Sequence, residues 1–245
     1  MNRIENGQKP LIIVPTFNEK DNLKALVEGI FKALGSEGHI LFIDDNSPDG
    51  TGDAVEDLRG SPLFSERIFL LRRPAKLGLG SAYKEGFSWG LQRGYSWLIE
   101  MDADLSHRPE YLPNMINLLK GHDVVIGSRY ITGGGTQNWG FLRRLISQLG
   151  CRYAQTILGL SIRDLTGGFN GWRRDVLAKI NPDTLTSEGY SFQIELKFRA
   201  YRLGFKIVEF PIVFFDRRVG QSKMRGRIVI EALWRVFALR WRFRK

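Results

Sequence analysis

The chain has 245 residues, 43% of them hydrophobic, which is enough to bury the core of one large domain and excludes a wholly disordered protein. Its single cysteine, Cys151, excludes an internal disulfide framework. The net charge of +10 is uneven, because residues 217–245 hold ten Lys and Arg against one acid, Glu231. A nearly neutral body with a basic tail indicates an anionic partner for the tail, such as a phosphate, a nucleic acid or an anionic membrane.

The start of the chain carries no recognisable export signal. The apolar run Leu11–Val14 is too short for the hydrophobic part of a signal peptide. No apolar stretch approaches the roughly 20 residues that a membrane-spanning helix needs. We therefore expect a cytoplasmic protein with no signal peptide and no transmembrane span.

Short apolar runs alternate with helix-like stretches through the first half. Each run is continuous rather than alternating, as in parallel strands that are buried on both faces. The predicted strands are Leu11–Val14, Ile40–Ile43, Ile68–Leu71, Trp97–Met101 and Val124–Ile126. The predicted helices between them are Glu19–Leu34, Thr51–Arg59, Ser81–Gln92 and Pro109–Leu119. This order predicts an α/β fold with right-handed crossovers and a mostly parallel sheet flanked by helices.

The second half is less regular. The Gly-rich stretch Thr132–Gly140 predicts a mobile loop. Helices are predicted at Leu142–Leu158 and Ser191–Leu203, followed by a strand at Lys206–Phe210 and the basic tail. Because there is no internal repeat and no low-complexity linker, the pattern predicts one compact domain with a C-terminal appendage.

Acidic residues follow three of the predicted strands. Glu19 comes soon after the first strand, Asp44 and Asp45 after the second, and Asp102 and Asp104 after the fourth. In an open parallel sheet, ligands bind beyond the carboxyl ends of the strands. The acids are therefore expected to converge on one edge of the sheet.

Asp102 and Asp104 flank one small residue directly after an apolar run. Mg²⁺ and Mn²⁺ favour carboxylate oxygens and usually share them with substrate phosphates. Two carboxylates this close repel each other unless a cation lies between them. The alternative is a solvated turn with acids at random, which a second acidic turn on the same edge disfavours.

The other residues at this edge have simpler alternatives. Asp44 and Asp45 suit either a turn that caps the helix near Thr51 or hydrogen bonds to a base or ribose. Glu19 suits the start of a helix. Residues 78–80, Gly-Leu-Gly, predict a tight turn rather than a phosphate-binding fingerprint, and His107 suits a helix start better than a ligand role.

Basic residues are also placed to meet such an edge. Arg129 follows the fifth strand, Arg143 follows the Gly-rich stretch, and Arg217 and Lys223 open the basic tail. Cations aimed at acids and a metal are useful if the ligand carries several phosphates, and otherwise they are solvated surface residues. No Ser/His/Asp or Cys/His set is legible, so covalent catalysis has no support.

These motifs, in this order, resemble the family 2 glycosyltransferases of GT-A fold, and within them the dolichyl- or polyprenyl-phosphate mannose synthases. The matching segments are IIVPTFNE at 12–19, IDDNSPDGT at 43–51, KLGLGSAY at 76–83, MDADLSH at 101–107, GSRYITGG at 127–134, NWGFLRRLIS at 138–147, DLTGGF at 164–169, SEGYSFQIE at 187–195 and FFDRRVGQSK at 214–223. The resemblance covers nearly the whole chain and implies a Rossmann-like, mostly parallel sheet.

The resemblance also implies site residues. The base and ribose of the nucleotide would be held by Pro15, Phe17, Glu19, Ile43 and Asp45, with Ala103 also touching the nucleotide. The metal, Mg²⁺ or Mn²⁺, would be held by Asp102, Asp104 and Ser106, which is shorter than the Gln found there in some relatives. Phosphates of donor and acceptor would be held by Arg129, Arg143, Arg217 and Lys223. Of these residues, the catalytic ones would be Asp104, Arg129, Arg217 and Lys223.

The implied reaction is an inverting transfer of mannose from GDP-mannose to the phosphate of dolichyl or polyprenyl phosphate. The acceptor phosphate is largely ionised at neutral pH, since its second pKa is about 6. No strong protein base is then needed, which agrees with the absence of a legible one.

The resemblance divides the chain into a glycosyltransferase domain, 1–216, and a basic phosphate-binding loop and C-terminal helix, 217–245. Residues 226–245 hold five arginines, Trp234 and Trp241 among apolar residues. Such a basic amphipathic helix suits an anionic membrane surface, and we expect a peripheral protein on the cytoplasmic face. The alternative is an ordinary amphipathic helix packed on the body. Both interpretations are correct if one face of the helix packs on the body and the other meets the membrane. A separate small membrane subunit is a further expected partner.

Three other functions fit parts of the pattern. A polyprenyl-phosphate glucosyltransferase, or another nucleotide-sugar transferase of the same fold, would share every motif. A nucleic-acid-binding protein would explain the basic tail, but the converging acids would repel a phosphate backbone, so no nucleic acid is expected. An inactive scaffold would need a broken metal site, whereas Asp102 and Asp104 are intact.

Overall fold

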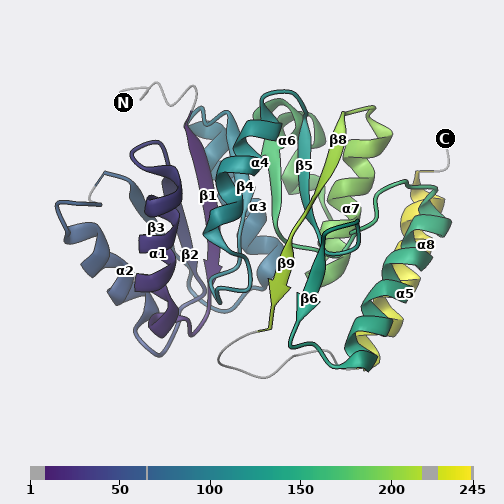
Figure 1. Ribbon diagram of the computed structural model, residues 1–245, viewed down its shortest axis with the longest axis horizontal. Coiled ribbons are helices and arrows are strands. Elements are labelled where there is room, and N and C mark those ends of the chain that lie inside the picture. The colour runs from purple at the N-terminus through teal and green to yellow at the C-terminus, as the bar shows by residue number, and fades with distance from the viewer. Residues whose placement is uncertain (1–8, 65, 217–225, 244–245) are drawn as a thin grey trace.

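The computed structural model describes residues 9–64, 66–216 and 226–243. A seven-stranded sheet lies at the centre, with helices on both faces (Figure 1), as the sequence predicts. The order of its strands is β3-β2-β1-β4-β7-β5-β8. These strands are β1 Pro10–Thr16, β2 His39–Asp44, β3 Ile68–Arg72, β4 Trp97–Glu100, β5 Val124–Ser128, β7 Asn170–Arg173 and β8 Ile207–Pro211.

The helices follow the predicted alternation. They are α1 Lys20–Leu34, α2 Thr51–Gly60, α3 Leu79–Gln92, α4 Leu112–Leu119, α5 Phe141–Leu158, α6 Arg174–Ile180, α7 Gly189–Arg202 and α8 Gly226–Arg242. Two short 3₁₀ helices, Pro109–Tyr111 and Pro182–Thr184, precede α4 and α7. The sequence did not predict α6, whose single short run of apolar residues gives little helical periodicity.

The sheet is mostly parallel, and β7 is the exception. β1 pairs in parallel with β2 and β4, β2 with β3, and β5 with β8. β7 lies antiparallel between β4 and β5. Its sequence, Asn-Gly-Trp-Arg, contains no apolar run, which is why the strand could not be predicted.

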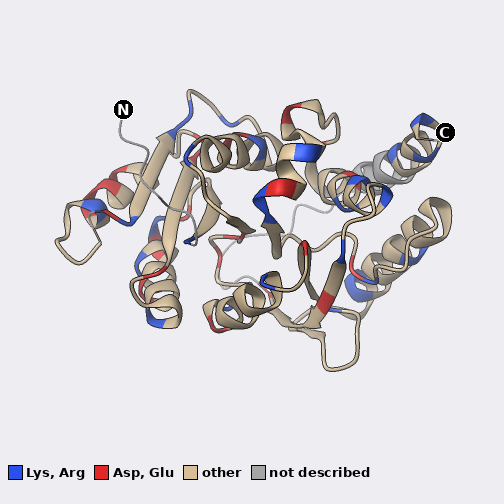
Figure 2. Cartoon of the chain, turned by 90° about the horizontal axis from the view of Figure 1, so that it is seen from above, with Lys and Arg blue, Asp and Glu red and all other residues tan. Residues whose placement is uncertain are grey.

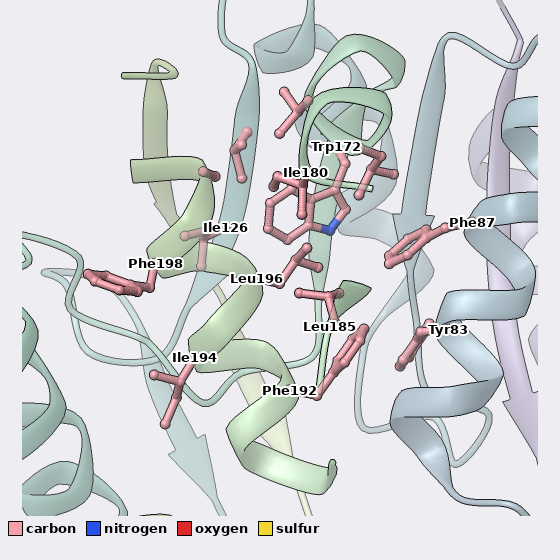
Figure 3. Close-up of a cluster of buried hydrophobic side chains, with 14 of the residues drawn as sticks. Tyr83, Phe87, Ile126, Trp172, Ile180, Leu185, Phe192, Ile194, Leu196 and Phe198 are labelled. Atoms are coloured by element: carbon pink, nitrogen blue, oxygen red, sulfur yellow. The ribbon is translucent and has the colours of Figure 1, made fainter. Parts of the chain in front are cut away.

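Alternate residues of the strands point into two hydrophobic cores. In β1, Leu11 and Ile13 join the core that α3, α5, α6, α7 and α8 cover, and Ile12 and Val14 join the core under α1, α2 and α4. Figure 3 shows aromatic side chains of the first core, in which Tyr83 stacks with both Phe87 and Phe192. Gly86 lets α3 approach the sheet closely, because a Cβ there would lie 2.5 Å from Ile13 Cγ2.

The predicted mobile loop Thr132–Gly140 is partly wrong, because it contains a strand. β6, Gly135–Gln137, pairs in parallel with β9, Val213–Phe215, to form a separate two-stranded sheet (Figure 1). Gly-Thr-Gln has no hydrophobic pattern of its own, and its partner is distant in the sequence. Local sequence therefore gave no signal for this strand.

The tail helix α8 packs against α5 and α7 at one end of the molecule (Figure 1). Val236 and Leu239 are buried against the body, whereas Trp234 and Trp241 are 71% and 66% exposed. Its last turn carries Arg240 and Arg242. Figure 2 shows Lys and Arg, in blue, on the helix that ends near the C-terminus. Packing on the body is therefore confirmed for one side of the helix, and the exposed tryptophans leave the other side for a partner. In the part of the chain that the structure describes, no helix is long and apolar enough to cross a membrane.

Candidate functional site

The strand ends that carry acids meet at one edge, as predicted. β1 lies between β2 and β4, and the three strands are parallel, so their carboxyl ends are neighbours. Asp44, opposite Thr16 in the register, accepts hydrogen bonds from the Thr16 hydroxyl at 3.0 Å and from the backbone N–H of Ser47 at 3.0 Å. Asp44 therefore shapes the turn, but the predicted cap on α2 is wrong, because the helix begins after Gly50 and it is Asp49 that accepts the backbone N–H of Thr51.

Asp45 holds the loop that leads into α3. It is buried, and its Oδ1 lies 2.9 Å from Nη1 of Arg73. Its Oδ2 accepts the backbone N–H groups of Leu77 at 3.2 Å and Gly78 at 3.3 Å. Gly78, at φ 95, precedes α3, which confirms the predicted tight turn. The sequence did not single out Arg73, whose partner became visible only in the fold.

The segment after β1 presents a ring that lies against a cation from the loop between β3 and α3. Nζ of Lys76 lies 3.5 Å from the centre of the half-buried Phe17 ring. Pro15 and Glu19 are half-buried beside it, and Glu19, at the start of α1, accepts a hydrogen bond of 2.8 Å from Asn22 Nδ2. A planar base could stack on such a ring, and the ring keeps this ability although it lacks a hydroxyl.

Two residues assigned to nucleotide contact have their side chains in the core. Ile43 is fully buried, and its Cδ1 packs where a Cβ of Gly86 would lie. Ala103 is 3% exposed and belongs to the core under α1 and α4. Because these apolar side chains fill the core, the predicted contacts of Ile43 and Ala103 with a nucleotide would have to come from their backbone.

The loop after β4 exposes one carboxylate and tightens around the other. The Asp102 side chain is 27% exposed, whereas Asp104 is buried and its Oδ1 accepts the backbone N–H of Ser106 at 3.0 Å. Leu105 has φ 61, a strained conformation for a branched side chain. Strain of this kind clusters at ligand-binding loops.

His107 contacts the backbone of this loop, and the prediction that it starts a helix is wrong, because the next helix begins after Arg108. Its Nδ1 accepts the backbone N–H of Asp102 at 3.1 Å, so the ring is neutral with its proton on Nε2. Burial lowers the pKa of His107 to about 4, which agrees with a neutral ring. The ring stacks on Phe169 and meets the edge of Phe214, with centroids 5.1 and 5.3 Å away.

The loop is suited to a divalent cation. The Ser106 hydroxyl is buried and has no hydrogen-bond partner among the described residues, so an oxygen ligand is left over beside the two carboxylates. Gly168 keeps space open, because a Cβ there would lie 3.9 Å from Asp102 Oδ1. Across the described residues, no three His, Cys, Asp or Glu side chains form a closed metal site. Mg²⁺ and Mn²⁺ commonly take such a partial set and complete it with phosphates and water.

Behind the loop, β4 ends in a fully buried acid, Glu100. Its carboxylate accepts hydrogen bonds from Gln193 Nε2 at 2.7 Å, Asn170 Nδ2 at 2.8 Å and Trp172 Nε1 at 3.0 Å. Burial raises the pKa of Glu100 to about 7, although these hydrogen bonds oppose the shift. Sequence reasoning missed this network, whose members come from β4, β7 and α7.

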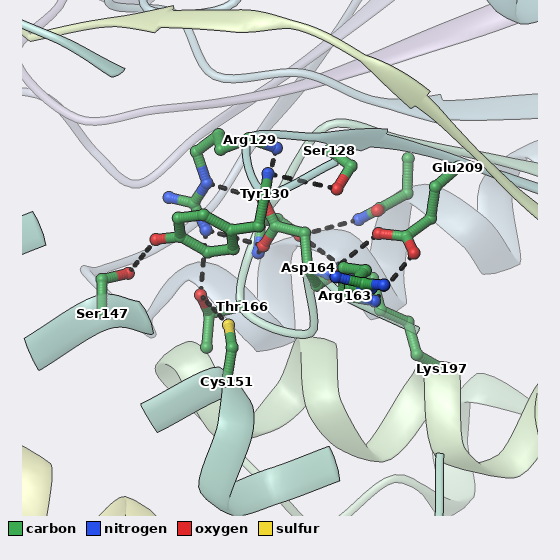
Figure 4. Close-up of polar contacts among 12 residues, drawn as sticks. Ser128, Arg129, Tyr130, Ser147, Cys151, Arg163, Asp164, Thr166, Lys197 and Glu209 are labelled. Carbon is green, nitrogen blue, oxygen red and sulfur yellow. Dashed lines mark hydrogen bonds and ion pairs between the residues drawn. The ribbon is translucent and has the colours of Figure 1, made fainter. Parts of the chain in front are cut away.

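Arg129, at the end of β5, is not a free cation. Its Nε and Nη2 each donate a 2.7 Å hydrogen bond to Asp164, and Nη2 also donates to Thr166 Oγ1 at 2.9 Å (Figure 4). Burial opposes ionisation of Asp164, but the Arg129 charge outweighs it and lowers the pKa of Asp164 to about 2. Lys197 donates to the backbone oxygens of Asp164 and Gly167, at 2.9 and 2.8 Å.

Arg143 lies close to Arg129, as the phosphate-binding interpretation requires. Both guanidinium groups lie over the ring of Trp139, at 4.1 Å for Arg143 and 5.5 Å for Arg129. Arg143 is partly exposed and pairs with Asp216 at 2.8 Å. Arg217 and Lys223, the other predicted phosphate ligands, lie outside the described residues.

The pattern of the family described as Glycosyl transferase family 2 matches residues 11–180, which contain the three acidic strand ends. The chain belongs to this family. The match spans β1 to α6, so it includes the Asp102–Asp104 loop and the Arg129–Asp164 pair.

Two curated relatives in the family resemble nearly the whole chain. Polyprenol monophosphomannose synthase of Mycolicibacterium smegmatis is 44% identical over 230 residues, which cover 94% of this chain and 86% of the relative. Undecaprenyl-phosphate mannosyltransferase of Micrococcus luteus is 45% identical over 235 residues, which cover 94% of this chain and 95% of the relative.

Solved structures establish the fold independently of close sequence similarity. Glucosyl-3-phosphoglycerate synthase from Mycobacterium tuberculosis, in complex with Mn²⁺, UDP-glucose and phosphoglyceric acid, superposes with a TM-score of 0.70 over 98% of this chain and 84% of its own. Its complex with UDP gives 0.67 over 96% and 81%. At 15% identity in both cases, the likeness concerns the fold, and it confirms the predicted GT-A architecture.

Proposed function

We propose that the protein transfers mannose from GDP-mannose to the phosphate of a polyprenyl phosphate, releasing GDP. The observation that carries this proposal is the similarity, over 94% of the chain, to two relatives whose names specify that sugar and that class of acceptor. The acidic edge of the sheet supports it, because it offers the oxygen ligands that a nucleotide diphosphate and its cation need.

On the donor side, the base would stack on Phe17 with Lys76 beside it, and Asp45 would hydrogen-bond the ribose. Asp45 now holds the backbone N–H groups of Leu77 and Gly78, so donor binding would exchange or share these contacts. Asp102, Asp104 and Ser106 would hold Mg²⁺ or Mn²⁺. When bound, such a cation would neutralise the negative charge of the leaving diphosphate.

On the acceptor side, Arg143 and Arg129 would hold the lipid phosphate near the sugar. Arg143 is the better placed of the two, since it is partly exposed and its acid partner, Asp216, is also partly exposed. The nucleophile is an oxygen of the acceptor phosphate, already ionised at neutral pH, so no protein base has to remove a proton. The chain's part is to orient two anions in line for a single displacement with inversion.

The lipid would approach along α5 and α8. Phe141, Leu142 and Leu149 on α5 are 80%, 67% and 52% exposed, and Trp234 and Trp241 on α8 are also exposed. Exposed aromatic rings with basic residues suit the headgroup region of an anionic membrane. We place the protein on the cytoplasmic face, where anionic lipids attract a basic tail, with a small membrane subunit as a further partner.

The test is transfer of radiolabelled mannose from GDP-mannose to undecaprenyl phosphate in detergent, with Mn²⁺, with Mg²⁺ and with EDTA. We expect label in the lipid phase only when a divalent cation is present. The same assay with GDP-glucose and UDP-glucose distinguishes the glucosyltransferase alternative. Label from a glucose donor and none from GDP-mannose would overturn the mannose assignment and leave the family intact.

A further inference from the structure

A cavity of about 160 Å³ lies beside α5, away from the acidic edge of the sheet. Its walls come from α5, from the residue after Arg129 and from the turn that follows α5. The lining residues are Tyr130, Gln148, Cys151, Arg152, Gln155 and Arg163. Along α5, Arg152 lies nine residues beyond Arg143, about 13 Å at the rise of an α-helix, so this arginine of the cavity is well separated from Arg143.

Two cations of the cavity lack acidic partners. Within the described residues, the guanidinium groups of Arg152 and Arg163 make no hydrogen bond and no ion pair, and both side chains are exposed. Arg129 and Arg143 differ, because each is paired with an acid. The cavity therefore carries positive charge that no described side chain balances.

The wall that holds Arg163 is rigidly built. Gln155 Nε2 donates to the backbone oxygens of Ile162 and Arg163, at 2.8 and 3.1 Å. The Glu209 carboxylate accepts the backbone N–H groups of Arg163 and Asp164, at 2.7 and 2.9 Å (Figure 4). These bonds fix the backbone at Arg163 from two sides, so only its side chain has to become ordered when a ligand binds.

The opposite wall is fixed as well. The Tyr130 hydroxyl donates to Ser147 Oγ at 2.6 Å, which ties the ring to α5, and Cys151 Sγ lies 3.5 Å from Thr166 Oγ1 (Figure 4). Burial raises the pKa of the Cys151 thiol, and the charge of Asp164 raises it further. The thiol therefore stays protonated and adds no negative charge to the cavity.

We propose that this cavity binds a phosphate group, held by the guanidinium groups of Arg152 and Arg163 and by the side-chain amide of Gln148. Guanidinium groups bind phosphate with two parallel hydrogen bonds, and the volume accepts a phosphate with a few further atoms. The phosphate comes either from a small phosphorylated molecule or from a phospholipid headgroup. The second source is within reach because Leu145 and Leu149, on the same helix, are 38% and 52% exposed.

The first experiment is a calorimetric titration of the full chain with inorganic phosphate at low ionic strength. The Arg152→Gln/Arg163→Gln variant should bind phosphate at least about tenfold more weakly, since it loses two charge-assisted contacts. The control, Arg93→Gln/Arg174→Gln, removes the same charge elsewhere and should change the affinity less than about twofold. All variants carry Arg143→Gln as well, which weakens phosphate binding at the proposed acceptor site while the paired Arg129 stays in place.

Equal loss in the two double variants would mean that phosphate responds only to net charge, and no binding in the Arg143→Gln background would place the phosphate at the acceptor site. Either result overturns the proposal. Both arginines are exposed, so the variants should keep the thermal unfolding temperature of the parent. Neither measurement depends on transferase activity, so failure here leaves the proposed function untouched.

The second experiment separates the two sources of phosphate. Co-flotation of each variant with phosphatidylglycerol vesicles is compared with its co-flotation with phosphatidylcholine vesicles. Selective loss of phosphatidylglycerol binding in Arg152→Gln/Arg163→Gln identifies the lipid headgroup. Unchanged flotation with lost phosphate binding identifies a small phosphorylated ligand. If neither assay separates this variant from its control, the cavity is not a phosphate site.

Discussion

Nε2 of Gln193, on α7, donates a 2.7 Å hydrogen bond to Oε1 of Glu100, which lies two residues before Asp102. Both side chains are buried, and Asn170 Nδ2 donates to each of them, at 2.8 Å to Glu100 and 2.9 Å to Gln193. The strand end that carries the Asp102–Asp104 loop is thus joined to a helix on one face of the sheet by a closed set of hydrogen bonds.

Exchanging the two residues tests this relationship. Glu100→Gln alone replaces one carboxylate oxygen with an N–H₂ group, which then faces either the Gln193 donor or the Asn170 donor, and we expect it to lower the free energy of unfolding by about 1–3 kcal/mol. In the exchange Glu100→Gln/Gln193→Glu, each N–H donor again faces an acceptor oxygen, so the double variant should recover most of that loss. Urea unfolding measures the free energy of unfolding. The Mn²⁺ concentration for half-maximal activity shows whether the Asp102–Asp104 loop is disturbed. A single variant as stable as the parent would contradict the prediction.

The pair of Arg129 and Asp164 should behave as a buried ion pair. Asp164→Asn leaves a buried guanidinium without its charge partner, and we expect a loss of about 3–5 kcal/mol in the free energy of unfolding. Arg129→Met/Asp164→Asn removes both charges and should be less destabilised than either single variant, Arg129→Met or Asp164→Asn. Denaturant unfolding of the four proteins forms a double-mutant cycle. Additive losses would show that the two residues are not coupled.

The sequence predicted the first half of the fold well, because its strands are continuous apolar runs and its helices have clear periodicity. The acids at Asp44, Asp45, Asp102 and Asp104 could be placed on one edge, since parallel strands end at the same edge. What could not be predicted depends on partners distant in the chain. β7 is polar and antiparallel, and β6 exists as a strand only beside β9.

The same limit applies to the site. Asp164, the partner of Arg129, is 35 residues away in the sequence, and Gln193, a partner of Glu100, is 93 residues away. No local sequence pattern could therefore identify these pairs. The motif at 164–169 was the one available signal for Asp164. His107 was given a helix-start role from its neighbours in sequence, whereas its ring supports the Asp102 backbone.

His39 should make stability depend on pH. Burial lowers its pKa to about 4, with the charges of Lys9 and Arg67 adding to the shift, from an ordinary value near 6.5. The unfolded chain therefore binds more protons than the folded chain between about pH 4 and pH 6.5, so stability falls as the pH falls through this range. We expect a loss of about 2 kcal/mol between pH 7 and pH 5 that is absent in His39→Gln. Parallel pH profiles of the two proteins would contradict this expectation.

The metal loop gives a pair of contrasting variants. Asp104→Ala should abolish transfer while the protein remains folded, because its carboxylate is one of two that would hold the cation. Ser106→Ala should raise the Mn²⁺ concentration for half-maximal activity a few-fold without lowering stability, since the buried hydroxyl has no partner to lose. Mn²⁺ titrations and thermal unfolding measure both. Full activity of Asp104→Ala would remove the metal assignment, and an unchanged Mn²⁺ requirement in Ser106→Ala would remove Ser106 from it.

Arg143 and Asp216 allow the acceptor side to be tested with changes of opposite charge. Arg143→Gln removes a cation that would hold the acceptor phosphate, and we expect kcat/KM for undecaprenyl phosphate to fall by about 10²–10³. Asp216→Asn keeps the arginine and removes the anion that lies 2.8 Å from it, so the KM for the acceptor should fall or stay the same. The KM for the donor serves as the internal control, because the proposal places Arg143 and Asp216 on the acceptor side. If Arg143→Gln raises the KM for GDP-mannose and leaves that for the lipid unchanged, Arg143 belongs to the donor side. The acceptor phosphate must then be held by Arg129 or by residues beyond position 216.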